Sequence, residues 1–233
     1  MSKQFVIVGG SKGIGFAIVQ RLLSEGNQVT VLSRTAEALE SLDGVTHIPW
    51  DASSEDLPAD QLPESIDGLV YCPGSLNLRS FKSLKPEVFQ EDFQLNVVGA
   101  IKTIQGCLKG MKSAGKSSVL MFSTVAVGQG MFAHASIAAS KGAIEGLTRT
   151  IAAELAPNVR VNCVAPALTN TPLTSKFFAT EEKANAMAEK YPLGRAGTVD
   201  DMANAAMFLL SDESSWITGQ VLGVDGGMST LRK

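Results

Sequence analysis

The chain has few histidines, cysteines and aromatic residues, and it contains neither a long apolar run nor a basic cluster. Its three cysteines are odd in number and widely spaced, which predicts reduced thiols and no metal site. No apolar run approaches the roughly 20 residues of a membrane-spanning helix, so we expect no membrane partner. The net charge of −3 leaves no basic surface for nucleic acid. Together these absences predict a cytoplasmic protein.

Hydrophobic residues make up 45 % of the sequence, and apolar runs alternate with stretches of helical periodicity. Such alternation is typical of a parallel sheet with helices on both faces. Strands are expected at residues 5–8, 28–33, 45–50, 68–71, 119–122, 159–164 and 219–224. Helices are expected between the first two strands and at 36–42, 86–112, 133–155 and 198–210. The sequence therefore predicts a single α/β domain over 1–233, a doubly wound Rossmann-type parallel sheet of about seven strands.

A glycine-rich turn joins the first expected strand to the first expected helix. Its spacing is Gly-x3-Gly-x-Gly, within residues 9–15. Glycines let the backbone approach a pyrophosphate, and the helix that follows offers free N–H groups to an anion. Such turns also occur for steric reasons, but the order of strand, turn and helix favours a dinucleotide site. The candidate cofactor residues in this turn are Gly9, Ser11, Lys12, Gly13, Ile14 and Gly15.

The end of the second expected strand carries a cation where an NAD site usually has a carboxylate. Ser33 is followed by Arg34, and neither Asp nor Glu stands there. A guanidinium can bind two oxygens of a 2′-phosphate, and Lys12 can reach the same region. The alternative is that both are solvated surface cations. The pattern favours NADP(H), with Ser33 and Arg34 as cofactor residues and Asp51, at the end of the third strand, as a further ligand contact.

Two later stretches are candidates for the substrate side of the site. The first runs from Phe122 to Leu147 and combines a strand end, a loop and a long helix that holds Lys141 among small residues. The second, at about 167–197, is polar and directly follows an expected strand. We expect this second stretch to be a substrate loop or lid.

In order and spacing, these motifs resemble the classical short-chain dehydrogenase/reductase family along nearly the whole chain. Residues 8–15 are similar to its Thr-Gly-x-x-x-Gly-Ile-Gly motif, with valine in place of threonine. The resemblance implies that Asp51 lies near the adenine ring, that Asn96 belongs to a proton relay and that Lys141 holds the nicotinamide ribose. It also implies cofactor contacts from Gly74, Asn96, Pro166 and Thr171.

The family's catalytic pattern is Tyr-x-x-x-Lys, but Ile137 stands four residues before Lys141. Residues i and i+4 share a helix face, so a tyrosine there would exchange protons beside the lysine, which isoleucine cannot do. Thr124 takes the place of the family's serine, and its hydroxyl can bond a substrate oxygen. His134 stands seven residues before Lys141, where the enoyl-thioester reductase branch has its tyrosine, and is a candidate proton donor. A histidine at a helix start can equally bond only backbone or water.

Three functions are compatible with this pattern. The first is hydride transfer between NADPH and a small carbonyl or activated-alkene substrate, with a non-standard proton donor. The second is an inactive NADP(H)-binding protein that acts as a binding or regulatory subunit. The third is a non-redox isomerase or lyase, which leaves the dinucleotide turn unexplained. The resemblance also implies a homodimer or homotetramer that pairs the helices at about 86–112 and 133–155.

Overall fold

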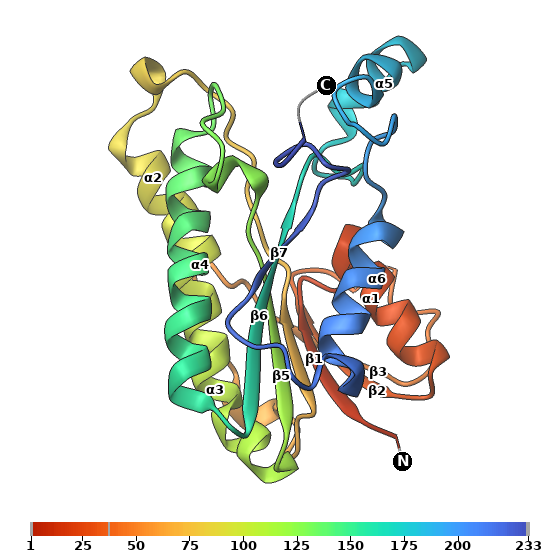
Figure 1. Ribbon diagram of the computed structural model, residues 1–233. Helices are drawn as coiled ribbons and strands as arrows, with labels where there is room; N and C mark the ends of the chain where they lie inside the picture. Colours follow the sequence, from red (N-terminus) through yellow and green to blue (C-terminus); the bar gives the residue numbers. More distant parts are fainter. Residues whose placement is uncertain (1, 37, 232–233) are drawn as a thin grey trace.

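A computed structural model describes residues 2–36 and 38–231 of the chain. Its centre is a sheet of seven parallel strands in the order β3-β2-β1-β4-β5-β6-β7 (Figure 1). The strands are β1 (Gln4–Val8), β2 (Gln28–Ser33), β3 (Val45–Pro49), β4 (Gly68–Tyr71), β5 (Ser117–Phe122), β6 (Val159–Pro166) and β7 (Val221–Val224). The doubly wound parallel sheet predicted from the apolar runs is confirmed.

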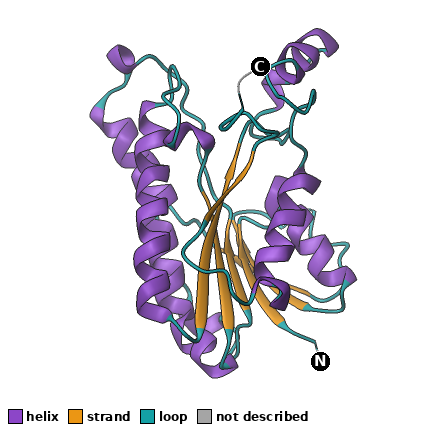
Figure 2. Cartoon of the chain, in the orientation of Figure 1, coloured by secondary structure: helices purple, strands orange, loops and turns teal. Residues whose placement is uncertain are grey.

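Helices cover both faces of this sheet, with α2, α3 and α4 on one side and α1 and α6 on the other (Figures 1 and 2). The helices are α1 (Gly13–Ser24), α2 (Pro86–Phe93), α3 (Gly99–Ala114), α4 (Ala135–Leu155), α5 (Glu181–Ala188) and α6 (Val199–Leu210). Alternate residues of each strand enter different cores because side chains of a strand point to opposite faces. In β1, Val6 and Val8 belong to the core beneath α3 and α4, whereas Phe5 and Ile7 belong to the core beneath α1 and α6. Of the helices described, none is both long enough and apolar enough to cross a membrane.

The helix predicted at 36–42 is wrong for the described residues of that stretch. They form two successive turns, each closed by a hydrogen bond between residues three apart. The Leu39 N–H donates to Ala36 O at 2.6 Å, and the Leu42 N–H donates to Leu39 O at 3.0 Å. Residue 37 lies outside the described residues. A seven-residue helix has too few intrahelical hydrogen bonds to offset the cost of nucleation, so short turns replace it before β3.

The helix predicted at 86–112 is present, but it is interrupted in the middle. A π-helical segment, Gln94–Val98, joins α2 to α3. The wider π turn changes the direction in which side chains project, compared with an uninterrupted α-helix. Asn96 lies in this segment and is fully buried. Single π turns inside helices occur frequently at functional sites.

The predicted substrate loop, 167–197, is partly helical. It contains a 3-10 turn, Ser175–Phe177, and then α5. A parallel bridge pairs Thr169 with Gly197, so the two ends of the segment lie side by side. Figure 1 shows α5 standing beyond the sheet, on the side where β6 ends. The segment therefore leaves the sheet and returns to it, and the bridge holds its two ends together. We call these paired ends the base of the segment.

Candidate functional site

A cleft of about 340 Å³ lies at the carboxyl ends of β4, β5 and β6. Residues directly after these strands line it, together with residues of α4 and of segment 167–197. Its lining is mostly apolar and includes Leu76, Met131, Leu173 and Phe177. Open α/β sheets bind ligands at the carboxyl ends of their strands. The position and the apolar walls indicate a site for a small molecule.

The glycine turn before α1 has a backbone that favours glycine. Gly9 and Gly13 have φ angles of +74° and +58°. A Cβ atom added to Gly15 would lie 2.3 Å from Gly9 O, so the turn closes this tightly only with glycine there. Helix α1 begins within the turn, and its first N–H groups have no intrahelical acceptor. The residues present therefore fit a pyrophosphate group.

The same turn borders the cleft. Ile14 is a lining residue, and a Cβ atom on Gly13 would lie 3.7 Å from Thr171 Cβ. Ser11 is buried, whereas Lys12 is exposed at the N-cap of α1. The fold thus brings Thr171, about 160 residues away in the sequence, against the predicted cofactor turn.

Arg34 and Asp51 follow the carboxyl ends of β2 and β3, as predicted. Asp51 accepts hydrogen bonds from Ser53 Oγ (2.6 Å) and Ser53 N (2.9 Å), which lower the pKa of Asp51. The positive charge of Arg34 lowers the pKa of Asp51 further. Arg34 itself is exposed. The two groups are therefore close together at the edge of the sheet where an adenosine moiety would lie.

Ser33 is next to Arg34, but its side chain is engaged within the protein. It is buried, its hydroxyl donates to Thr35 O at 2.8 Å, and it lies 3.1 Å from His47 Nε2. The hydroxyl thus stabilises the end of β2. Any cofactor contact from Ser33 would have to come from its backbone.

Lys141 is a buried lysine on α4 that lines the cleft. Its Nζ lies 3.5 Å from Pro73 O. Burial lowers the pKa of Lys141 to about 8, because desolvation disfavours the ammonium form, while Cys163, Cys72 and Asp92 partly raise it. A lysine with this pKa can give and take protons near neutral pH.

The other predicted residues of this stretch line the same cleft. The Thr124 hydroxyl accepts a hydrogen bond from Ala126 N at 3.3 Å, at the start of a 3-10 turn after β5. His134 is the N-cap residue of α4, and its Nδ1 lies 2.7 Å from Phe132 O. Ile137 is one helical turn before Lys141 and is only 5 % exposed. Pro166 and Gly74 also line the cleft.

Asn96 belongs to a buried polar cluster beside the site, and the sequence analysis, which named Asn96, missed its partners Asp92, Ser75 and Asn77. Asp92 is 1 % exposed and accepts hydrogen bonds from Ser75 Oγ and, at 2.8 Å, from Asn77 Nδ2. Asn96 Nδ2 donates to Ser75 Oγ at 3.1 Å and to Asp92 O at 2.7 Å. Asp92 Oδ2 and Asn96 Oδ1 have no hydrogen-bond partner among the described residues. The only signal in the sequence was the four-residue spacing of Asp92 and Asn96.

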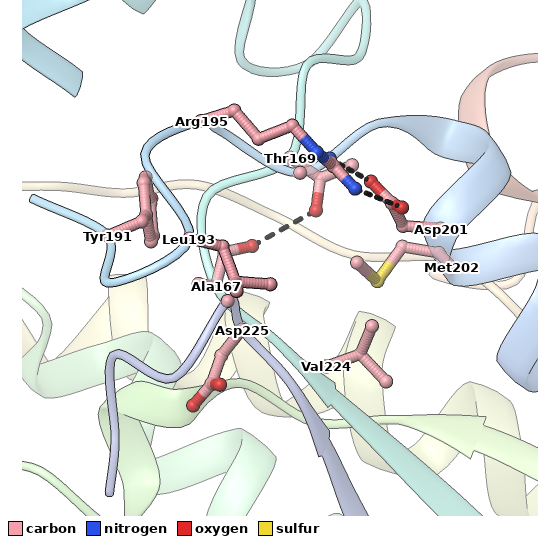
Figure 3. A pocket seen from close by; sticks show the side chains of 11 residues that line it. Ala167, Thr169, Tyr191, Leu193, Arg195, Asp201, Met202, Val224 and Asp225 are labelled. Atoms are coloured by element: carbon pink, nitrogen blue, oxygen red, sulfur yellow. Dashed lines mark hydrogen bonds and ion pairs between the residues drawn. The ribbon is translucent and has the colours of Figure 1, made fainter. Parts of the chain in front are cut away.

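A second pocket, of about 100 Å³, lies at the base of segment 167–197 (Figure 3). Arg195 holds Asp201 there through two contacts, of 2.6 Å and 2.8 Å, and the pKa of Asp201 is lowered by this pairing. The Thr169 hydroxyl donates to Ala167 O at 3.1 Å. The Arg195–Asp201 pair joins the base of the segment to α6, whereas the Thr169 hydrogen bond lies within the segment. Within 2–36 and 38–231, no three His, Cys, Asp or Glu side chains are grouped so that they could hold a metal ion.

A parallel doubly wound sheet, a glycine turn and a cleft at the strand ends define a Rossmann-type protein with an enzyme-like site. Residues 8–229 match the family model described as enoyl-(acyl carrier protein) reductase. A solved short chain dehydrogenase/reductase family protein has a TM-score of 0.89 and 32 % identity, with 98 % of each chain covered. The chain belongs to the short-chain dehydrogenase/reductase family.

Several relatives are similar over nearly their whole length. Carbonyl reductase family member 4 of Danio rerio is 36 % identical, with 99 % of this chain and 100 % of the relative covered. L-xylulose reductase of Bos taurus is 32 % identical, with 97 % and 96 % covered. The structure of aldohexose dehydrogenase from Thermoplasma acidophilum has a TM-score of 0.89 and 28 % identity, with 99 % and 95 % covered. ElxO, whose structure contains bound NADP, has a TM-score of 0.88 and 25 % identity, with 99 % and 100 % covered. The first two of these relatives are reductases by name and the third is a dehydrogenase, and the family uses NAD(P).

Proposed function

We propose that this chain is an NADP(H)-dependent oxidoreductase that reduces a small carbonyl or activated-alkene substrate with a non-standard proton donor. The observation that carries this proposal is the convergence of the glycine turn, Thr171 and the buried Lys141 on one apolar cleft. The bound cofactor supplies the hydride, and the chain supplies binding, orientation and a proton. Ile137 occupies the position at which the family has its tyrosine, so the proton must come from another group.

We assign the cofactor roles by the positions of the residues at the carboxyl ends of the strands. Residues 9–15 hold the pyrophosphate at the start of α1, and Asp51 lies beside the adenine. Arg34 and Lys12 bind the 2′-phosphate. Lys141 holds the nicotinamide ribose. Contacts to the remaining nicotinamide side come from Gly74, Pro166 and Thr171, which line the cleft. Asn96 was also predicted to touch the cofactor, but it is fully buried and does not line the cleft, so it can act only through its neighbours.

Arg34→Asp is expected to weaken NADPH binding about 10- to 100-fold and to leave NADH binding nearly unchanged. The reason is that the guanidinium makes charge-assisted hydrogen bonds only with the 2′-phosphate, each worth about 1.5–3 kcal/mol. Fluorescence titration with both cofactors measures the difference. Lys116→Asp is the control and makes the same charge change at an exposed position. Lys116 directly precedes β5, at the amino ends of the strands, whereas Arg34 lies at the carboxyl ends. An equal loss for both cofactors in Arg34→Asp would show that Arg34 does not meet the 2′-phosphate.

The reaction is tested by NADPH consumption with a panel of ketones, enones and enoyl thioesters. The candidate donors are His134, Thr124 and water. If His134 or Thr124 is the donor, its replacement by alanine should lower the turnover of whichever substrate is accepted by about 100-fold or more, the usual contribution of a positioned proton donor. Unchanged turnover in both variants would leave water or another group as the donor.

The alternative function is an NADP(H)-binding protein without turnover, and the specific observation that favours it is Ile137. Micromolar NADPH binding without consumption over the whole panel would establish this alternative. Substrate conversion without any change in NADPH absorbance would instead indicate a non-redox isomerase or lyase.

We also infer a cytoplasmic homodimer or homotetramer that pairs α3 and α4 of neighbouring subunits. The support is family membership and the outer position of these helices (Figure 1). Light scattering of the purified chain tests the assembly, and a mass of one chain would contradict it.

A further inference from the structure

In the buried polar cluster of Asp92, Ser75 and Asn96, the chemistry of the groups decides which of them donates each hydrogen bond and which accepts it. A carboxylate can only accept hydrogen bonds, so the Ser75 hydroxyl must give its proton to Asp92 Oδ1. The Ser75 oxygen can then only accept, and the group that donates to it is Asn96 Nδ2, at 3.1 Å. The amide nitrogen of Asn96 also donates to Asp92 O at 2.7 Å. Both hydrogens of the amide are therefore committed to α2 and Ser75.

This order fixes which end of the Asn96 amide faces the site. Asn96 Oδ1 points away from the cluster and is 3.7 Å from the place where a Cβ on Gly74 would lie. Lys141 Nζ is also 3.7 Å from that point, and no other atom outside the neighbouring residues lies within 4 Å of it. The carbonyl oxygen and the ammonium thus both border the space beside Gly74. Asn96 Oδ1 is buried and has no partner among the described residues, so its need for a donor points to this space.

We propose, on the basis of the proposed function, that Asp92 and Ser75 are positioning residues: they turn the Asn96 carbonyl towards Lys141 and hold Lys141 as an ammonium that protonates the substrate. Lys141 Nζ reaches the substrate side because Lys141 lines the cleft, whereas Asp92 and Asn96 stay behind it. The substrate carbon gains a hydride from the reduced nicotinamide, which is oxidised. The substrate oxygen, or the second alkene carbon, gains a proton from Lys141, whose N–H bond breaks and whose electron pair stays on nitrogen. The neutral amine then regains a proton from solvent.

The charges around Lys141 are consistent with this role for Asp92. Burial lowers the pKa of Lys141 to about 8, and the groups that raise it are Cys163 of β6, Cys72 after β4 and Asp92 of α2. Burial raises the pKa of both thiols to about 12, so at neutral pH they carry no charge. Asp92 is therefore the one of these three groups whose charge can raise the pKa of Lys141 at neutral pH. On α4 itself, Glu145 accepts a hydrogen bond from Ser123 at 2.7 Å. The other titratable group that lines the cleft beside Lys141 on α4 is His134.

The test is the pKa of Lys141 in Asp92→Asn, measured without turnover by the pH dependence of lysine acetylation and peptide mass spectrometry. The amide keeps an oxygen for Ser75 and Asn77 but removes the charge, so the pKa of Lys141 should fall by about one unit. Glu91→Gln removes a charge from the exposed neighbour on the same helix and should leave this pKa unchanged. In the active enzyme, reduction needs protonated Lys141, so activity falls as the pH rises through its pKa. In Asp92→Asn this fall should occur at lower pH, with kcat reduced and KM unchanged.

Ser75→Ala provides a second test if Asp92→Asn does not fold. It keeps the charge but frees the Asn96 amide to turn, so the pKa of Lys141 should fall by a smaller amount in the same direction. A folded Asp92→Asn, or a folded Ser75→Ala in its place, that has the native pKa of Lys141 overturns the proposal. If no substrate is turned over, the proposed function fails, and the pKa measurement still decides whether the cluster controls Lys141.

Discussion

The Ile137→Tyr variant is expected to reduce ketones about 100 to 10,000 times faster than the native chain, the range contributed by a positioned general acid. The new phenol would lie one helical turn from Lys141, on the same face of α4. The Lys141 ammonium would lower the pKa of the phenol and favour proton transfer to a carbonyl oxygen. Ile137 lines a cleft of about 340 Å³, which leaves room for the larger ring.

Ile137→Phe is the matched control for this variant. It adds almost the same ring but no hydroxyl, so it separates proton donation from a change in cleft shape. NADPH oxidation with a panel of ketones measures all three proteins. If the tyrosine and phenylalanine variants show equal rates, the missing phenol is not what limits carbonyl reduction here.

Gly15→Ala is expected to abolish tight cofactor binding, with a loss of about 100-fold or more in NADPH affinity. The added Cβ would lie 2.3 Å from Gly9 O, and both atoms belong to backbone, so the turn must open to relieve the contact. Opening the turn displaces the N–H groups that bind the pyrophosphate, and each such hydrogen bond to a charged group contributes about 1.5–3 kcal/mol. Overpacking of this kind also destabilises the fold by about 1–3 kcal/mol.

Isothermal titration with NADPH and urea denaturation measure these two effects. Gly130→Ala is the control because Gly130 is exposed, has no positive φ, and its added Cβ meets nothing within 4 Å. It should bind NADPH as the native chain does. Native affinity in Gly15→Ala would mean that the turn does not hold the cofactor.

The sheet could be predicted from the sequence because its buried central strands are short, nearly continuous apolar runs, as parallel strands covered on both faces usually are. The glycine turn and Lys141 were also visible, since their roles depend on local spacing. The cluster of Asp92, Ser75 and Asn96 was not visible. Ser75 and Asp92 are 17 residues apart, and their contact exists only because β4 and α2 end at the same place. The π-helical segment was also missed, because an extra residue in one turn leaves no mark in hydrophobic periodicity.

The helix predicted at 36–42, which the structure lacks over its described residues, has a different cause. The apolar spacing of these residues favoured a helix, but seven residues form too few intrahelical hydrogen bonds to offset the cost of nucleation. Ser33 shows the same limit on a smaller scale. Its position at the end of β2 was predicted, but its contact with His47 depends on the neighbouring strand β3.

The closed base of segment 167–197 has a consequence for how substrate range can change. The bridge between Thr169 and Gly197 fixes the distance between the two ends of the segment. The Arg195–Asp201 pair holds the end of the segment against the start of α6. With the ends fixed, each doubling of the length between them costs only about 0.6 kcal/mol in closure entropy. Insertions and deletions in this stretch can therefore enlarge or shrink the wall of the cleft while the seven strands and the cofactor turn stay as they are.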